Sequence, residues 1–236
     1  MNLRKKIALS LIIGGLLLCL LPTAIIYFSD IYKAHLQKEE AEEWIKKEEA
    51  KKSETEPTET TLVPESPKIE DTEVPESPKI EDPEPLVIFP GNEGYLLEIP
   101  KIDLRLVIRE LEPEAFSGKN TPMLKKYGAG QVPYTEYLKN VSPGDDGTAA
   151  ITGHRTTSGA PFRHLDLLEP GDEIIISQGE IKQKWEVIYT RIVLPSQIDA
   201  IRSIPGIRRL VILACNPPGS GRERIIVYAK LSEGGE

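Results

Sequence analysis

The pattern of hydrophobic and polar positions divides the chain into three parts. Residues 7–28 form an almost unbroken apolar run, and residues 29–85 are mainly polar and charged. From residue 86 onward, short apolar runs alternate with turns rich in Pro and Gly. A single long apolar run predicts a membrane helix, whereas short runs between turn residues predict strands.

The third part predicts one all-β domain over residues 86–236. Its apolar runs are rich in β-branched residues and cover residues 95–99, 104–108, 148–152, 173–177, 185–193, 210–214 and 225–231. Short helices are expected near 121–127 and 162–168. So many short strands with few helices predict a β-barrel or sandwich, and about 150 residues suffice for one core.

The N-terminal run predicts an uncleaved signal anchor. Arg4, Lys5 and Lys6 precede residues 7–28. Positive residues stay on the cytoplasmic side, so residues 1–6 are expected in the cytoplasm and the remaining chain outside. The alternative is a cleaved signal peptide, but residues 21–25 offer a poor cleavage site. We therefore expect a single-pass protein of the cell membrane.

Two polar segments separate this anchor from the domain. Residues 29–52 are rich in Ala, Glu and Lys without Pro or Gly, which predicts a solvated, charged helical stalk. In residues 53–85 an 11-residue repeat starts at Val63 and recurs at Val74. Its prolines exclude a helix, and its acidic excess predicts a disordered linker that acts as a spacer.

The charge distribution excludes one class of function. The formal net charge is −8, but residues 29–85 hold 18 of the 37 acidic residues, so the domain itself is nearly neutral. A nucleic-acid-binding domain needs a basic face, which the domain lacks. His, Cys and carboxylate residues form no tight cluster, so the sequence identifies no metal ligands and leaves metal dependence open. No cofactor is expected.

Three residues at strand ends predict a cysteine active site. Cys215 follows the run 210–214, His154 follows the run 148–152, and Arg224 opens the last run. A cysteine is nucleophilic as its thiolate, which a nearby imidazolium or guanidinium favours, and a histidine can also carry protons. An arginine can stabilise a developing oxyanion.

Simpler interpretations of the same residues stay open. The chain has 2 cysteines, and Cys19 lies in the apolar run, so a disulfide with Cys215 is implausible. Cys215 can instead be a buried structural cysteine, and His154 a core histidine. Arg222 competes with Arg224, because strand alternation puts both on one face.

These motifs resemble the sortase family over residues 94–231. The resemblance rests on Thr152-Gly153-His154, on the strand that ends in Cys215, on Arg224, and on the segment LEIPKI at residues 97–102. Residues 153–162 are most similar to class E sortases, with class D next. The resemblance implies an eight-stranded β-barrel and a membrane-tethered cysteine transpeptidase. Such enzymes cleave an LPxTG or LAxTG sorting signal of a surface protein between Thr and Gly. They pass the acyl group to an amine of a peptidoglycan precursor or a pilin.

The resemblance also implies residue roles. Cys215 matches the nucleophile, His154 the general acid and base, and Arg224 the active-site arginine. Neighbouring residues are expected to bind substrate, namely Thr152, Gly153, Arg155, Ala214 and Asn216. Residues 194–208 match the substrate-facing loop between the family's sixth and seventh strands.

Two residues depart from the family pattern, and two other functions remain possible. Ala214 stands where the family usually has Thr, and Gln131 where class E sortases commonly have His. A thiol endopeptidase with this fold would hydrolyse its substrate whether or not an amine is present. A module that only binds the cell wall would leave Cys215 unreactive.

Overall fold

The computed structural model describes residues 3–54, 94–112 and 122–232. Within helix α1 (Leu3–Glu54), side chains are described for residues 20–50 apart from 22, 23 and 26. The predicted linker therefore lies almost wholly outside the described residues, as do most side chains of the predicted membrane segment 7–28. In the described part of the chain, no helix is both long and apolar enough to span a bilayer.

All seven predicted strands are confirmed, and an eighth is added. They are β1 (Tyr95–Ile99), β2 (Leu104–Ile108), β4 (Thr148–Gly153), β5 (Glu173–Gln178), β6 (Ile181–Val193), β7 (Arg209–Asn216) and β8 (Glu223–Leu231). The eighth, β3 (Ala129–Gln131), was not predicted because the sequence Ala-Gly-Gln has no apolar alternation.

Short helices fill some of the connections. Helix α2 (Pro122–Tyr127) and the 3₁₀ turn η3 (Leu165–Leu167) lie where the sequence predicts helices. Two further 3₁₀ turns, η1 (Pro100–Ile102) and η4 (Ile198–Ile201), were not predicted. Such short turns leave almost no periodic signal in a sequence.

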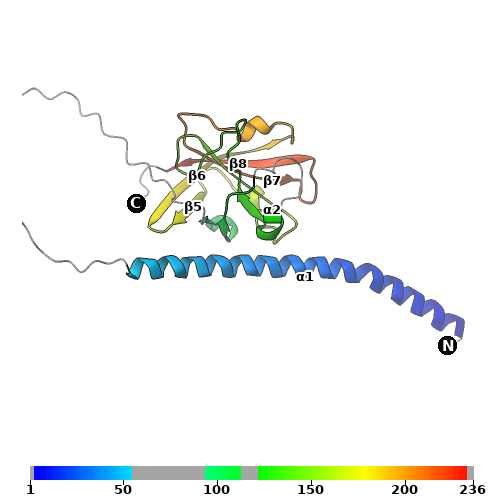
Figure 1. The fold of residues 1–236 in the computed structure, drawn as a ribbon. Coiled ribbons are helices and arrows are strands. Elements are labelled where there is room, and N and C mark those ends of the chain that lie inside the picture. Colours follow the sequence, from blue (N-terminus) through cyan, green and yellow to red (C-terminus); the bar gives the residue numbers. More distant parts are fainter. Residues whose placement is uncertain (1–2, 55–93, 113–121, 233–236) are drawn as a thin grey trace, which may run out of the picture.

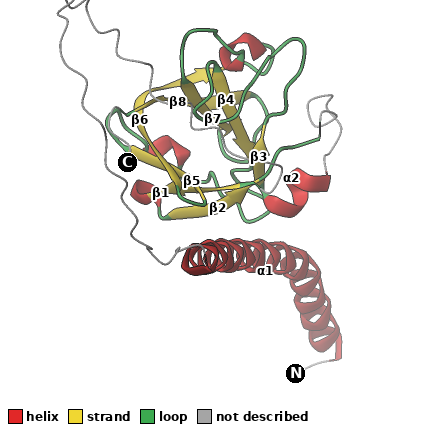
Figure 2. Ribbon diagram, turned by 60° about the vertical axis from the view of Figure 1, so that its left-hand side comes forward, coloured by secondary structure: helices red, strands yellow, loops and turns green. Residues whose placement is uncertain are grey.

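The strands form one sheet that curls into a barrel (Figures 1 and 2). Their order is β2-β1-β5-β6-β8-β7-β4-β3. The two edge strands meet through Gln131, whose N–H donates to the Arg109 carbonyl at 2.8 Å and whose carbonyl accepts from the Leu111 N–H at 2.9 Å. The predicted eight-stranded barrel is therefore confirmed. Closure satisfies sheet edges that would otherwise be exposed.

Alternate residues of β7 face two different hydrophobic clusters. Leu210, Ile212 and Ala214 belong to the main core, which also contains Trp185 and Phe162. The intervening residues Val211 and Leu213 pack in a second cluster with Val193 and with Ile201 of η4. By strand alternation, Cys215 lies on the same face as Leu213. This second face carries the site described below.

Helix α1 lies along the barrel beside β2 and α2, as both views show (Figures 1 and 2). Ala41 is fully buried and packs with Leu96 and Val107, and Trp44 and Ile45 cover this cluster. The prediction of a solvated helical stalk is therefore wrong for one face of the helix. Its apolar residues are few, but they share one helix face, and that face is buried.

Candidate active site

The free cysteine lies near the end of β7. Cys215 is half-buried, and it forms no disulfide. In the antiparallel ladder of β7 and β8, Cys215 is paired directly with Arg224. Directly paired residues have Cβ atoms about 4.5–5.5 Å apart on one face of the sheet. The predicted thiol and guanidinium are thus cross-strand neighbours.

His154 directly follows β4, which runs parallel to β7. The last register pair of these strands joins Gly153 to Ala214. His154 and Cys215 are the next residue on each strand, so their side chains start from adjacent backbone positions. The backbone of His154 is held on both sides, because its N–H donates to the Gly128 carbonyl at 2.8 Å and its carbonyl accepts from Phe162 N–H at 3.0 Å.

A cavity of about 290 Å³ opens on the same face of the sheet. Thr152 and Leu213 line it, each two residues before His154 and Cys215 on the respective strand, and Arg224 lines it from β8. The remaining walls are mainly aliphatic and come from Leu111, Leu124, Val193, Leu194, Pro195, Gln197, Ile198, Ile201 and Ile226. Five of these belong to residues 194–208, the segment predicted to face the substrate.

The environment of His154 favours the neutral imidazole. Burial is the main cause that lowers the His154 pKa below its ordinary value. The positive charge of Lys33 lowers the pKa further, and the negative charge of Asp30 opposes this effect. Both charges belong to α1. A neutral imidazole at physiological pH is able to take a proton from a thiol.

The structure distinguishes the two candidate arginines. Arg224 lines the cavity, and its Nη1 donates to the carbonyls of Gly221 at 3.1 Å and Glu223 at 2.9 Å. These bonds hold the guanidinium at the N-terminal end of β8. Arg222 precedes the strand and is exposed. Geometry therefore favours Arg224 as the partner of Cys215.

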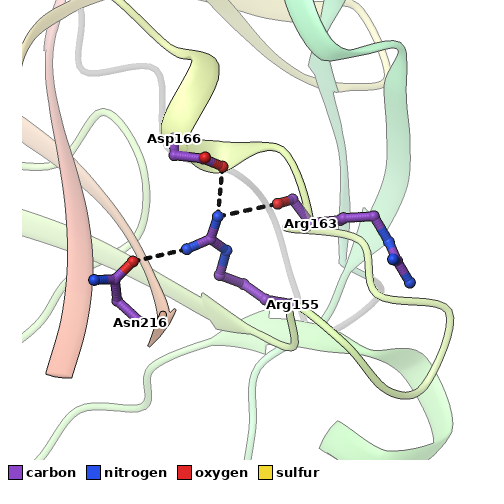
Figure 3. A network of polar contacts seen from close by, with 4 residues as sticks. All are labelled: Arg155, Arg163, Asp166 and Asn216. Atoms are coloured by element: carbon purple, nitrogen blue, oxygen red, sulfur yellow. Dashed lines mark hydrogen bonds and ion pairs between the residues drawn. The ribbon is translucent and has the colours of Figure 1, made fainter. Parts of the chain in front are cut away.

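Arg155 joins the segment after His154 to the segment after Cys215 (Figure 3). Its side chain is only 3% exposed. One guanidinium nitrogen donates to Asn216 Oδ1 at 2.9 Å, and another donates to the Arg163 carbonyl at 3.1 Å and pairs with Asp166. Asn216 in turn donates to Glu223 Oε2 at 2.9 Å. The network thus ties together the ends of β4, β7 and β8.

The predicted substrate-binding residues are placed in different environments. Thr152 lines the cavity, whereas Gly153 and Ala214 are buried toward the main core. Arg155 donates a hydrogen bond to Asn216, the residue after Cys215. Contacts of these five residues with a substrate stay a prediction. For Arg155 and Asn216, the structure shows that each side chain helps to hold the other in place.

Sequence reasoning missed the part that α1 contributes. Asp30 and Lys33 act on His154, and Gln37 reaches the loops that flank it. The signal that was available is the shared face of Gln37, Ala41, Trp44 and Ile45, which are three and four positions apart. Among the described residues, no group of three or more His, Cys, Asp or Glu is placed to hold a metal ion.

The chain matches known proteins over this domain. A family model described as the Sortase domain matches residues 97–232. Sortase SrtE1 of Streptomyces coelicolor is 31% identical over 158 residues, which cover 61% of this chain and 42% of that protein. Sortase SrtE2 of the same organism is 30% identical over 111 residues and is covered to 43%. The chain therefore spans less than half the length of these curated relatives.

Solved structures agree with this match. The crystal structure of Sortase E1 from Streptomyces coelicolor, with a tripeptide in its active site, has a TM-score of 0.51 and 26% identity. The alignment covers 59% of this chain and 88% of that one. Streptococcus agalactiae sortase C1 has a TM-score of 0.50 and 22% identity over 61% of this chain and 72% of that one, which shows a likeness of fold.

Proposed function

The chain belongs to the sortase family and is class E-like, and on this basis we propose that it is a membrane-anchored cysteine transpeptidase. It cleaves an LPxTG or LAxTG sorting signal of a surface protein between Thr and Gly. The acyl group passes through Cys215 to an amine of a peptidoglycan precursor or a pilin.

One observation carries the proposal. Cys215 is paired with Arg224 in the β7–β8 ladder, and His154 and Cys215 each follow the last pair of the β4–β7 ladder. Arg224 also lines the cavity. A nucleophile, a proton carrier and an oxyanion donor are the three groups that acyl transfer through a thioester requires. The related Sortase E1 holds a tripeptide in its active site, which supports a peptide as substrate.

In acylation, the neutral imidazole of His154 takes the proton of the Cys215 thiol. The thiolate sulfur forms a bond with the Thr carbonyl carbon, and the carbonyl oxygen becomes an oxyanion that the Arg224 guanidinium stabilises. When the oxyanion collapses, the C–N bond to Gly breaks, and the His154 imidazolium gives its proton to the departing Gly nitrogen. A thioester on Cys215 and a neutral imidazole result.

In deacylation, the acceptor amine attacks the thioester carbonyl. His154 takes a proton from the amine, a new amide bond forms, and the C–S bond breaks to release the Cys215 thiolate. The imidazolium then returns the proton to the thiolate. Atoms and charges balance over the cycle, because one amide is exchanged for another.

The cavity fits the apolar start of such a signal. Aliphatic side chains from β6, η4 and β7 form much of its walls, and Arg224 and Thr152 add polar groups to the lining. A volume of about 290 Å³ accommodates a Leu side chain together with a Pro or an Ala. Few precisely placed polar groups in an apolar groove are typical of peptide recognition.

The membrane anchor and domain layout are proposed from sequence. Residues 7–28 span the membrane with residues 1–6 in the cytoplasm. The catalytic domain, residues 86–236, then lies on the outer side, where sorting-signal proteins and wall amines meet.

Peptide ligation tests the proposal. The chain of residues 1–236, in detergent micelles, is incubated with a fluorescent peptide that ends in a sorting signal and with an oligoglycine amine. Mass spectrometry then follows the ligated peptide, and parallel peptides carry Pro or Ala at the second signal position. Cys215→Ala is the control.

Three results are informative. A ligated product from wild type but not from Cys215→Ala supports transpeptidation. A hydrolysed peptide whose yield is independent of added amine favours a thiol endopeptidase. Equal behaviour of wild type and Cys215→Ala refutes a thioester route and leaves a wall-binding module.

A further inference from the structure

Helix α1 binds the domain through a continuous surface. Ala41, which is fully buried, packs with Leu96 of β1 and Val107 of β2. At the edge of this contact, Arg109 Nη2 donates to Glu40 Oε1 at 2.8 Å, and both groups are largely shielded from solvent. Apolar burial with a partly buried ion pair fixes the helix more firmly than surface charges alone.

Gln37 is the polar centre of this contact. It is only 8% exposed, and its Nε2 donates to the carbonyls of Tyr127 at 2.9 Å and Ser158 at 3.0 Å. A buried amide with both bonds made is well satisfied, whereas losing it would leave two carbonyls without their donor. The side chain therefore connects two loops that are far apart in sequence.

Two glycines make room for that side chain. A Cβ on Gly128 would lie 2.6 Å from Gln37 Nε2, and a Cβ on Gly159 would lie 2.5 Å from Gln37 Oε1. Both glycines have a positive φ, +78° and +80°, which other residues rarely adopt. The loops are thus shaped closely around the Gln37 amide.

The same two loops hold His154. The Gly128 carbonyl accepts a hydrogen bond from the His154 N–H at 2.8 Å. Ser158 lies in the segment from His154 to Phe162, and the Phe162 N–H donates to the His154 carbonyl. Asp30 adds a second tie from the helix, since its Oδ1 accepts from Ser158 N–H at 3.1 Å. Movement of α1 would therefore be transmitted to the backbone of His154.

We propose that α1 is a working part of the active site, with Gln37 as a positioning residue that fixes the backbone around His154. This inference rests on the proposed function, in which His154 carries the proton. The helix does not line the cavity, so its effect falls on the rate of transfer and leaves the affinity for the sorting peptide unchanged. The face of α1 that carries Gln37 and Ala41 is then part of the catalytic unit.

Two variants of the full chain test this proposal. Gln37→Met keeps the volume of the side chain and removes both hydrogen bonds, and Ala41→Glu places a charge in the contact and lifts the helix. Glu43→Ala, on the exposed face of the same helix, is the control. Each variant is assayed for ligation kcat and KM, and for hydrogen exchange of the backbone N–H groups within residues 154–161.

We expect both variants to lower kcat about ten-fold or more while KM stays within about two-fold, because a misplaced catalytic group costs transition-state stabilisation only. Exchange in residues 154–161 should become faster. Glu43→Ala should match wild type in both measurements. A variant that merely loosened the barrel would instead speed exchange in β7 and β8 as well.

If wild type ligates and both variants keep its kcat and its slow exchange, the proposal is overturned. If wild type does not ligate at all, the proposed function fails, but exchange still decides the inference. Slow exchange of residues 154–161 in wild type and fast exchange in Gln37→Met would support the helix as the holder of this loop. Equal exchange in both would overturn it.

Discussion

Replacing Arg155 by Ala should destabilise the domain and slow the proposed reaction. The guanidinium bonds to Asn216 and to the Arg163 carbonyl, and it pairs with Asp166 (Figure 3). Hydrogen bonds from a charged donor are worth about 1.5–3 kcal/mol each. The pair with Asp166 adds little, because that side chain is 53% exposed and is readily hydrated.

One unsatisfied group partly offsets this loss in the free energy of unfolding. The Arg155 Nε is buried and has no hydrogen-bond partner among the described residues. Removing this buried, unsatisfied donor recovers about 1 kcal/mol of stability. The net loss is about 3 kcal/mol, which corresponds to a fall in Tm of roughly 6–12 °C for a domain of this size.

Arg163→Ala is the matched control. Only the backbone carbonyl of Arg163 takes part in the network, and its side chain points away from it (Figure 3). Thermal unfolding followed by near-UV circular dichroism, and the alkylation rate of Cys215 by iodoacetamide, measure the two effects. Arg155→Lys should restore little, because an ammonium does not reproduce the planar fork.

The expected result is a lower Tm and an altered Cys215 alkylation rate in Arg155→Ala alone, because Asn216, the residue after Cys215, loses its hydrogen bond to Arg155. If Arg155→Ala and Arg163→Ala unfold within about 2 °C of each other, the network contributes far less than these bond energies imply. That result would refute a stabilising role for the network in Figure 3.

Three further predictions concern buried positions near the site. In Gly153→Ala, the new Cβ would lie 2.6 Å from the Phe162 ring, so urea unfolding should show a loss of about 1–3 kcal/mol; unchanged stability would contradict this packing. Ala214 is 2% exposed in the main core, so Ala214→Thr buries a hydroxyl and should cost about 1–3 kcal/mol; faster ligation without that cost would show that the side chain reaches the substrate. Burial lowers the pKa of His154, so between the pKa of the folded state and about pH 6.5 the unfolded chain binds a proton that the folded chain does not, and the domain loses stability as pH falls through this range. Urea unfolding at two pH values should show a steeper loss for wild type than for His154→Gln, and equal slopes would contradict a buried neutral imidazole.

Local pattern was sufficient for much of the fold. Strands such as β7 and β8 carry continuous runs of β-branched and apolar residues between turn signals, so their position follows from a few neighbouring residues. β3 has no such pattern, and it exists because Gln131 bonds to the backbone after β2 when the barrel closes. Its signal is a partner about twenty residues away, which no local window contains.

The sequence predicted which residues form the candidate site, and the strand pairing showed how they come together. Cys215, His154 and Arg224 were identified because polar residues at strand ends often carry chemistry, and the sortase resemblance gave their roles. The pairing of β7 with both β4 and β8 then made neighbours of residues about sixty positions apart. Sequence alone gives no register between distant strands.

By itself, then, the sequence predicted seven of the eight described strands, the family and three candidate site residues, because these depend on side-chain chemistry and on short-range periodicity. Only the tertiary structure decided the burial of Arg155, the core position of Ala214 and the docking of α1. Gln37 illustrates the reason. In a stretch rich in Lys and Glu it reads as a surface residue, and it becomes buried only when two distant glycine loops close around its amide. Burial belongs to the folded assembly of segments, and no single segment encodes it.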